Sequence, residues 1–465
     1  MVTEKAIHPL RTTQLIRESY LRYLKTAYPF VDDDLRQDYW NALEEKDQLV
    51  KGPLLEATPE FRNGRSIQGL VQANILHPSF EKLCGPALPY ERPLYLHQEK
   101  AIVKSVAQRR NLVVATGTGS GKTETFLIPI LNHLLIEKQN GTLHQPGVRA
   151  LLLYPMNALA NDQLKRLRKV LKGTDEIKFG RYIGETKKTR SEAETQFANQ
   201  FRGIKPLKNE LLSREEMQEK PPHLLITNYA MLEYLLLRPA DHAFFDGETA
   251  SFWRYIILDE AHVYDGANGI EIAMLLRRLK DRVLQSEKGR LQIIATSATL
   301  GGGPKDYPAV VQFASNLFGE EFLWTEDENK QDVVQAERNR TALDAKGWRE
   351  DDPALFYQLN AYLEQAHPSP DIVELEQIAR KCGTPKDILA SAKPANSTTN
   401  PSEQIPLYLY KLLSMNHRLV RLKQILEGTP KLLHEVAGQI FSDLDNPEES
   451  LIALVNLAVR SRPDR

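Results

Sequence analysis

Residues 112–124, LVVATGTGSGKTE, combine the residue types that bind a nucleoside triphosphate. Glycines after an apolar run let backbone N–H groups turn toward phosphate oxygens, and the N-terminus of a following helix adds positive charge. We expect Lys122 to reach the β- and γ-phosphates and Thr123 to ligate Mg²⁺. The strict pattern has glycine where this chain has Thr116. The predicted loop residues are Thr116, Gly117, Thr118, Gly119, Ser120, Gly121, Lys122, Thr123 and Glu124.

A second segment, YIILDEAH at 255–262, carries an acidic pair that suits metal and water chemistry. Its apolar run delivers Asp259 and Glu260 to the carboxyl end of a strand, where catalytic groups of open α/β sheets gather. Asp259 suits the Mg²⁺ site, and Glu260 suits a general base that orients water. An acidic pair also occurs as a helix N-cap, but its place after the phosphate loop favours catalysis. The sequence therefore predicts ATP and Mg²⁺ as cofactors.

Gln98, in LYLHQEKAI at 94–102, precedes the phosphate loop. Its side-chain amide matches the N6 donor and N7 acceptor of adenine, so we predict an adenine contact. A surface glutamine on the helix that leads into the loop is the alternative.

Apolar runs separated by helical patterns indicate the elements that must position these residues. Continuous runs of this kind predict an α/β domain with a parallel sheet that is buried on both faces. The runs are 112–116, 148–154, 178–183, 223–228, 255–259 and 291–297. Residues 192–221 are polar and lack a strong period, so we expect an exposed insertion there.

Helical patterns flank the predicted α/β domain on both sides. The expected division is a helical accessory region at 1–88, an ATP-binding domain at 89–304, a helical extension at 305–391, a linker at 392–406 and a helical segment at 407–465.

The composition is that of an ordinary globular protein, with 42% hydrophobic and 26% charged residues among 465. A formal net charge of −1 excludes a global basic surface, so any contact with nucleic acid requires local patches. Cys84 and Cys382 are far apart, which predicts no disulfide and no zinc site. No long apolar run or signal-peptide pattern is present, so we expect a cytoplasmic location and no membrane partner.

Several motifs in order resemble superfamily 2 DEAD/DEAH-box helicases. TGTGSGKT, DEAH and TSAT (296–299) are similar to motifs I, II and III, while LLLYPMNALANDQLKRL, GRYIGET and LLITNYAMLEYLLLRP resemble the motif Ia and Ib regions. The resemblance covers residues 90–302 and implies a RecA-like P-loop NTPase domain. The motif forms are similar to the large bacterial helicases around MrfA and Lhr. The segment LVKGPLLEATPEF (49–61) resembles very large helicases of phage-defence systems such as DISARM and Druantia.

This resemblance implies roles for further residues. Ser297 and Thr299, together with His262, would couple the γ-phosphate to the nucleic-acid track, because their hydrogen bonds can rearrange when that phosphate leaves. Strand-end capping is the alternative for the two hydroxyls. The predicted catalytic residues are Glu260, Lys122 and His262. The predicted contacts to a nucleic-acid backbone are Asn157, Tyr182, Gly184, Thr186, Thr227 and Asn228.

Residues 161–190 add local positive charge, with ten lysines or arginines against four acids. The run supports a contact with nucleic acid, although a solvated helix face is the alternative. No residue suggests base-specific recognition. DNA is favoured over RNA on the form of the motifs alone.

The resemblance implies the ATP-binding lobe of an ATP-dependent DNA helicase or translocase. Such motors close ATP between two RecA-like lobes, and the second lobe supplies an arginine finger. No second parallel-sheet pattern or QxxGRxGR-type motif follows residue 300, so we expect weak ATPase activity from this chain alone. We expect a piece of a longer protein, and a natural half with a partner subunit stays open. A role in phage defence or DNA repair, with other defence-complex subunits as partners, is a further expectation. An RNA helicase and a non-motor ATP-gated clamp or scaffold are alternatives.

Overall fold

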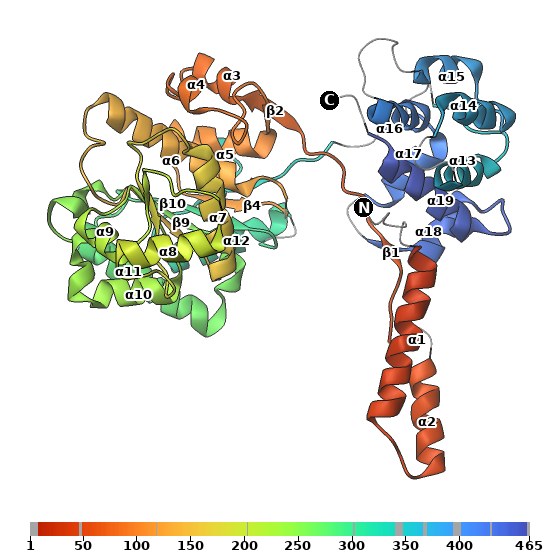
Figure 1. Cartoon of the computed structure of the whole chain (residues 1–465), viewed down its shortest axis with the longest axis horizontal. Helices are drawn as coiled ribbons and strands as arrows, with labels where there is room; N and C mark the ends of the chain where they lie inside the picture. The colour runs from red at the N-terminus through yellow and green to blue at the C-terminus, as the bar shows by residue number, and fades with distance from the viewer. Residues whose placement is uncertain are drawn as a thin grey trace. The chain divides into compact units, whose positions relative to one another are not determined.

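The computed structural model describes residues 8–45, 49–117, 119–201, 203–300, 303–339, 347–365, 370–393, 401–427 and 430–462. Two compact units make up the chain. Residues 61–338 form the sheet unit, and residues 1–60 together with 339–465 form the helical unit (Figure 1).

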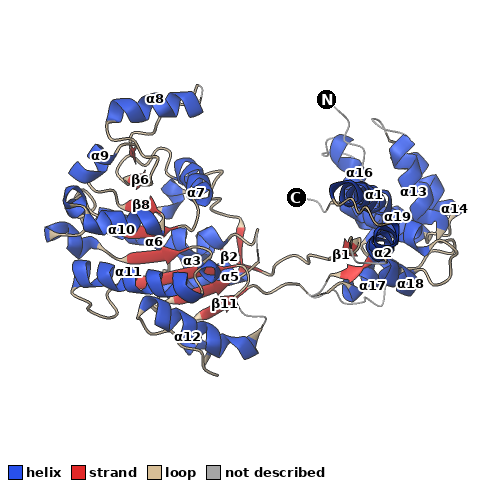
Figure 2. Ribbon diagram, turned by 90° about the horizontal axis from the view of Figure 1, so that it is seen from below, coloured by secondary structure: helices blue, strands red, loops and turns tan. Residues whose placement is uncertain are grey.

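An eight-stranded sheet lies at the centre of the sheet unit, in the order β11-β4-β10-β9-β5-β8-β6-β7 (Figure 2). Every pairing in it is parallel. The strands are β4 Leu112–Ala115, β5 Ala150–Leu153, β6 Phe179–Arg181, β7 Glu210–Leu211, β8 Leu224–Thr227, β9 Tyr255–Leu258, β10 Gln292–Ser297 and β11 Val333–Gln335. Since β10 lies between β4 and β9, the carboxyl ends of these three strands are neighbours, and the predicted catalytic residues follow β4 and β9.

Helices cover both faces of the sheet, which explains why its central strands are apolar without alternation. Val114 packs in a core with α5, α6 and α7, whereas Val113 packs in a second core with α10, α11 and α12. The helices of the sheet unit are α3 Ile67–Gln72, α4 Phe80–Leu83, α5 Leu96–Val106, α6 Lys122–Gln139, α7 Asn157–Val170, α8 Arg190–Gln200, α9 Arg214–Glu219, α10 Tyr229–Leu237, α11 Gly266–Leu284 and α12 Tyr307–Phe318. Short 3-10 turns occur at η1 Pro239–Phe244, η2 Gly247–Phe252, η3 Ala261–Val263, η4 Pro304–Asp306 and η5 Glu328–Lys330.

The segment 192–221, expected as an exposed insertion, is instead part of the sheet layer. It contains β7 and α9, and the side chains of Phe197, Glu210 and Met217 are buried. Glu210 pairs with Arg168 of α7 at 2.6 Å. The segment is therefore held by a few long-range contacts, which produce no periodic pattern in the sequence.

The borders of the sheet unit differ from those expected at 88 and 304. Ile67, Leu70 and Phe80 are fully buried in the core beneath the sheet, so the segment that follows residue 60 belongs to the sheet unit. Its strand β2 Asn63–Ser66 pairs with β3 Pro93–Tyr95. At the other end, β11 adds to the sheet edge beside β4.

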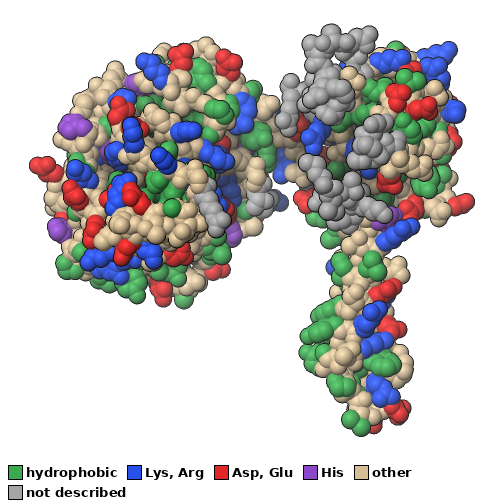
Figure 3. Space-filling model, in the orientation of Figure 1, with side chains coloured by type: hydrophobic (Ala, Val, Ile, Leu, Met, Phe, Trp, Pro, Cys, Tyr) green, Lys and Arg blue, Asp and Glu red, His purple; other side chains and the backbone are tan. Residues whose placement is uncertain are grey.

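The helical unit combines both ends of the chain. Strand β1 Leu54–Leu55 pairs with β12 Lys431–Leu432, and Leu355, Leu409 and Leu454 are among the fully buried residues of its core. Its helices are α1 Pro9–Ala27, α2 Asp33–Glu44, α13 Ala354–Gln365, α14 Ile372–Lys381, α15 Lys386–Ala392, α16 Pro401–Leu413, α17 His417–Ile425, α18 Leu433–Ile440 and α19 Pro447–Arg460. Helices α1 and α2 bury no residue, and apolar side chains are visible along them in Figure 3.

The expected linker at 392–406 is described only in part, because residues 394–400 lie outside the described residues. Residues 401–406 begin α16, which contains Pro406. The first part of the helical segment predicted at 407–465 is divided between α16 and α17, where Asn416 caps the second helix through its side chain. Within the described ranges, no helix is both long and apolar enough to cross a membrane.

Candidate nucleotide-binding site

The loop between β4 and α6 requires glycine on stereochemical grounds. Gly119 and Gly121 have φ angles of 75° and 72°, a region that other residues rarely adopt. Gly117 and Gly119 have open space where a side chain would stand, whereas a side chain at Gly121 would collide with Nε2 of Gln98. Thr118 lies outside the described residues. The loop therefore leaves its backbone open to a ligand on one side and is closely packed on the other.

Thr116 replaces the first glycine of the strict pattern, and the structure gives its side chain a partner. Its hydroxyl lies 2.7 Å from that of Ser120, and both residues are buried. Its backbone N–H donates to the carbonyl of Ser297 on β10 at 3.0 Å. The threonine at the position of the first glycine thus forms a hydrogen bond within the loop.

Lys122 and Glu260 meet across the site. The ammonium of Lys122 lies 3.1 Å from Oε1 of Glu260. Glu260 has a φ of 52°, an uncommon left-handed conformation for a side-chain-bearing residue and a form of strain found at functional sites. Its other oxygen, Oε2, is buried without a hydrogen-bond partner in the described part of the chain and lies 3.4 Å from Nδ1 of His262. That oxygen is available to accept a proton or to orient a water molecule.

Asp259 and Thr123 supply the oxygen atoms expected for a divalent cation. The hydroxyl of Thr296 donates to Oδ1 of Asp259. Burial raises the pKa of Asp259, since a charged carboxylate is poorly solvated there. The hydroxyl of Thr123 accepts a hydrogen bond from Gln163 at 3.2 Å. Carboxylate and hydroxyl oxygens are ligands that Mg²⁺ prefers, and a cation would offset the cost of the buried charge, so these residues fit the metal.

Ser297 links the end of β10 to His262. Its Oγ accepts the backbone N–H groups of Thr299 at 3.2 Å and Leu300 at 3.1 Å. Its Oγ also lies 3.1 Å from Nδ1 of His262. Because two amides occupy the acceptor positions of the hydroxyl, its proton is free for the imidazole. Ser297 therefore caps the strand end and contacts the DEAH segment at once.

Gln98 is not the exposed glutamine of the alternative interpretation, because it is only 5% exposed. Its Oε1 accepts the N–H of Tyr95 at 2.8 Å, and its Nε2 donates to the carbonyl of Gly121 at 2.9 Å. Both ends of the amide that we predicted to contact adenine are thus bonded within the protein. The neighbouring His97, which the sequence interpretation passed over, contacts the carbonyl of Ser120 at 2.9 Å. Its only signal was its place beside Gln98 in the segment before the loop.

Asn157 and Asn228, two of the predicted contacts to nucleic acid, lie together at the ends of neighbouring strands. Asn157 begins α7 after β5, and Asn228 caps α10 after β8 by accepting the N–H of Met231 at 2.8 Å. The amide of Asn228 donates to Oδ1 of Asn157 at 2.8 Å. Gly184, which follows the end of β6, is exposed.

The structure corrects the prediction for the other three side chains, which lie in the interior. The hydroxyl of Tyr182 donates to Asp241 at 2.8 Å, and burial raises its pKa. Thr227 donates to the carbonyl of Tyr182 at 2.6 Å, and Thr186 to that of Arg181 at 2.9 Å. These side chains organise the sheet edge and are not presented to a phosphate backbone.

The basic run at 161–190 is partly neutralised by ion pairs. Arg166 pairs with Glu124, Arg168 with the buried Glu210, and Lys165 with Asp162 at 2.9 Å. Exposed lysines remain at 169, 172, 187 and 188. The run is therefore a mixture of structural arginines and exposed lysines.

Comparison with known proteins identifies relatives of this domain. Residues 95–307 match the family model of the DEAD/DEAH box helicase. Druantia protein DruE of Escherichia coli is 32% identical over 390 residues, which cover 64% of this chain and 21% of that protein. The ATP-dependent helicase Lhr-Core of Methanothermobacter thermautotrophicus is 28% identical over 207 residues, covering 44% of this chain and 21% of that protein. The chain thus spans about a fifth of the length of these relatives.

A solved structure of the DUF1998 helicase MrfA bound to DNA is also similar to this chain. It is 19% identical with a TM-score of 0.43, and the match covers 78% of this chain and 46% of that chain.

Proposed function

We propose that this chain, whose residues 95–307 are a DEAD/DEAH box helicase domain, is the ATP-binding lobe of an ATP-dependent DNA helicase or translocase. The reaction is hydrolysis of ATP to ADP and phosphate, coupled to movement along nucleic acid. The observation that carries this proposal is the 3.1 Å pairing of Lys122 with Glu260 between the ends of β4 and β9. It unites a phosphate-binding cation and a general base in one site.

Each residue of this site has a role that follows from its chemistry. Lys122 and the backbone N–H groups of the loop bind the β- and γ-phosphates. Glu260 orients the attacking water and accepts its proton, for which its Oε2 is suited, since no described residue forms a hydrogen bond with that oxygen. Thr123 and Asp259 would hold Mg²⁺. When bound, the metal neutralises charge that develops on the phosphates.

Coupling to the track is assigned to His262, Ser297 and Thr299. The bond between His262 and Ser297 connects the DEAH segment to the end of β10, next to the strand that carries the phosphate loop. Loss of the γ-phosphate changes the charge beside Glu260, and His262 lies 3.4 Å from that carboxylate. A shift of the imidazole would thus reach Ser297 directly.

The track is proposed to contact Asn157, Gly184 and Asn228, with the exposed lysines of 161–190 adding electrostatic attraction. DNA is favoured because the motif forms are similar to bacterial helicases of the MrfA and Lhr type. RNA is the alternative, since the ATP-dependent RNA helicase DBP7 of Meyerozyma guilliermondii is 32% identical over 150 residues.

The second RecA-like lobe, with its arginine finger, is proposed to come from further residues of a longer polypeptide or from a partner subunit. Similarity to DruE supports a role in phage defence, with other defence-complex subunits as partners, and DNA repair is the alternative pathway. We place the protein in the cytoplasm.

Nucleotide binding tests the proposal directly. Titration of a fluorescent, nonhydrolysable ATP analogue with Mg²⁺ into the chain is expected to saturate, and Lys122→Ala is expected to weaken binding at least about tenfold. Equal binding by both proteins would refute the assignment of the loop. A non-motor clamp is distinguished by adding the second lobe: nucleotide-dependent DNA affinity without DNA-stimulated ATP hydrolysis would favour the clamp.

A further inference from the structure

Two consecutive side chains hold two consecutive carbonyl groups of the phosphate loop. Nε2 of His97 contacts the carbonyl of Ser120, and Nε2 of Gln98 donates to the carbonyl of Gly121, both at 2.9 Å. In a trans peptide unit the C=O and N–H groups point in opposite directions. The carbonyl of Ser120 shares its peptide unit with the N–H of Gly121, and that of Gly121 with the N–H of Lys122. Fixing both carbonyls toward α5 therefore directs two N–H groups away from it, as a phosphate-binding loop requires.

His97 is held in this position by aromatic rings. It is 1% exposed, and its ring stacks on that of Tyr95 with 5.7 Å between the ring centres. The ring of Phe61 meets it edge-on with 5.3 Å between the centres. Burial lowers the pKa of His97, which favours the neutral imidazole with one N–H. Nδ1 is buried without a partner among the described residues, which assigns that proton to Nε2 and to the bond with Ser120.

Phe61 is the first residue of the sheet unit, and Arg338 is its last. Phe61 forms a bridge with Arg338, whose guanidinium lies 4.5 Å from the centre of the Phe61 ring. The next residue, Arg62, donates its N–H to the carbonyl of Glu337 at 2.8 Å. The entering and leaving segments are thus hydrogen-bonded to each other beside Phe61. The ring of Phe61 contacts both Arg338 and His97.

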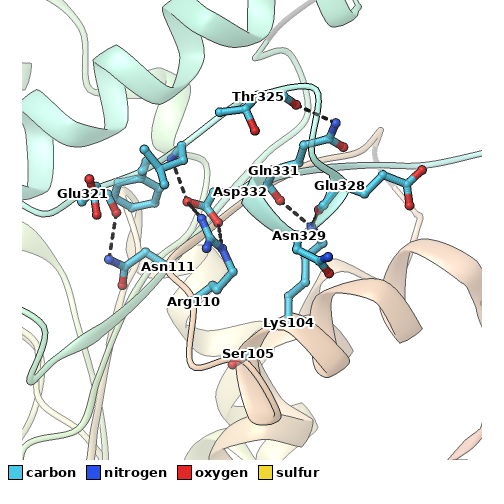
Figure 4. Close-up of polar contacts among 12 residues, drawn as sticks. Lys104, Ser105, Arg110, Asn111, Glu321, Thr325, Glu328, Asn329, Gln331 and Asp332 are labelled. Carbon is cyan, nitrogen blue, oxygen red and sulfur yellow. Dashed lines mark hydrogen bonds and ion pairs between the residues drawn. The ribbon is translucent and has the colours of Figure 1, made fainter.

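The leaving segment is fastened upstream of this junction, as Figure 4 shows. Asp332 receives two hydrogen bonds from Arg110, at 2.5 and 2.9 Å. Lys104 of α5 donates to the carbonyls of Glu328 and Gln331, at 2.7 and 2.6 Å. The leaving segment is therefore tied to α5, the helix that carries His97 and Gln98.

We propose that His97 is a positioning residue for ATP, which aims the phosphate loop through the Ser120 carbonyl, and that Phe61 and Arg338 link this support to the entering and leaving segments. The inference rests on the proposed function of the loop in binding ATP. Because coupling is reciprocal, nucleotide binding would in turn stabilise the contact between the entering segment at Phe61 and the leaving segment at Arg338.

Matched variants of the full chain test this inference, with the fluorescent ATP analogue as probe. His97→Phe keeps a ring in the stack but removes the donor, and we expect about tenfold weaker binding, the typical effect of losing one buried hydrogen bond. His97→Gln restores a side-chain N–H and is expected to remain within about threefold of the wild type. Phe61→Leu retains the hydrogen bond between His97 and Ser120 but removes the aromatic contact with His97, and it should weaken binding about threefold. His144→Phe changes an exposed histidine in the same way and serves as the control.

The affinities of the variants for the ATP analogue test the positioning role of His97, and thermal melting of each variant reports on folding. Wild-type affinity in His97→Phe would overturn the positioning role. So would equal losses in His97→Phe and His97→Gln that follow a fall in melting temperature, since that result indicates a purely structural residue. Unchanged affinity in Phe61→Leu would overturn the link to the entering and leaving segments. If the wild-type chain does not bind the analogue, the proposed function itself fails, which is a separate outcome.

Discussion

Nδ1 of His262 lies 3.1 Å from Oγ of Ser297, so this contact joins the DEAH segment to the end of β10 beside the hydrogen bond that Thr296 donates to Asp259. The hydroxyl of Ser297 also accepts the backbone N–H groups of Thr299 and Leu300. The same hydroxyl thus responds to the histidine and orders the loop that follows the strand.

Ser297→Ala should separate ATP binding from motor activity. The hydroxyl does not belong to the phosphate loop, so affinity for the ATP analogue is expected to stay within about twofold of the wild type. Stimulation of ATP hydrolysis by single-stranded DNA should fall at least about tenfold, because the link to His262 is lost. The measurement uses the two-lobed assembly. Ser251→Ala, which changes an exposed serine in η2, is the control, and full DNA stimulation in Ser297→Ala would refute the coupling role.

Glu260→Gln should bind ATP but fail to hydrolyse it. The amide keeps the shape of the carboxylate and loses its basicity, so water is no longer activated. In the two-lobed assembly we expect kcat to fall by about 10² to 10⁴, the range typical of a lost general base. Affinity for the ATP analogue should be retained or increased, because the ion pair that Glu260 forms with Lys122 is weakened. Rapid hydrolysis by this variant would assign the base to another residue.

Arg168→Ala should destabilise the sheet unit more than a surface substitution does. Glu210 is 1% exposed, so removal of its arginine partner leaves a buried charge without compensation. Loss of one partner of a buried pair costs about 3–5 kcal/mol in the free energy of unfolding. Urea denaturation provides the measurement, with Lys169→Ala on the exposed side of the same helix as the control. A loss below about 1 kcal/mol would show that the pair is solvated.

Asp443→Asn should reveal a pH-dependent contribution in the helical unit. The guanidinium of Arg418, 2.7 Å away, lowers the pKa of Asp443 to about 2. A carboxyl group whose pKa is lowered on folding contributes stability above its unfolded pKa, and that contribution disappears as the pH falls through the folded value. The variant should therefore melt at a lower temperature than the wild type at pH 7. The difference should shrink between about pH 4 and pH 2.

Asp445→Asn changes a nearby exposed carboxyl group and is the control for this series. A difference in melting temperature between Asp443→Asn and the wild type that persists unchanged at pH 2 would contradict the ion-pair explanation.

Local pattern was sufficient for much of the nucleotide site. The run 112–124 predicted a strand, a glycine loop and a helix, and the structure has β4, the loop and α6 in those places. The same holds for Asp259 and Glu260 at the end of β9. These features depend on residues adjacent in sequence, since glycine conformation, strand burial and helix starts are decided within a few positions.

Only the tertiary structure decided which residues distant in sequence contact each other. Strands β7 and β11, of two and three residues, are too short to produce a pattern, and their pairing depends on neighbouring strands. Burial of Tyr182 and Thr227 follows from the packing of α10 and η1 over the sheet edge, which their residue types did not reveal. The sequence by itself determined that a phosphate loop and an acidic strand end exist. Only the fold placed His97 beneath Ser120 and Phe61 against His97, because contacts between distant segments leave no periodic signal in either one.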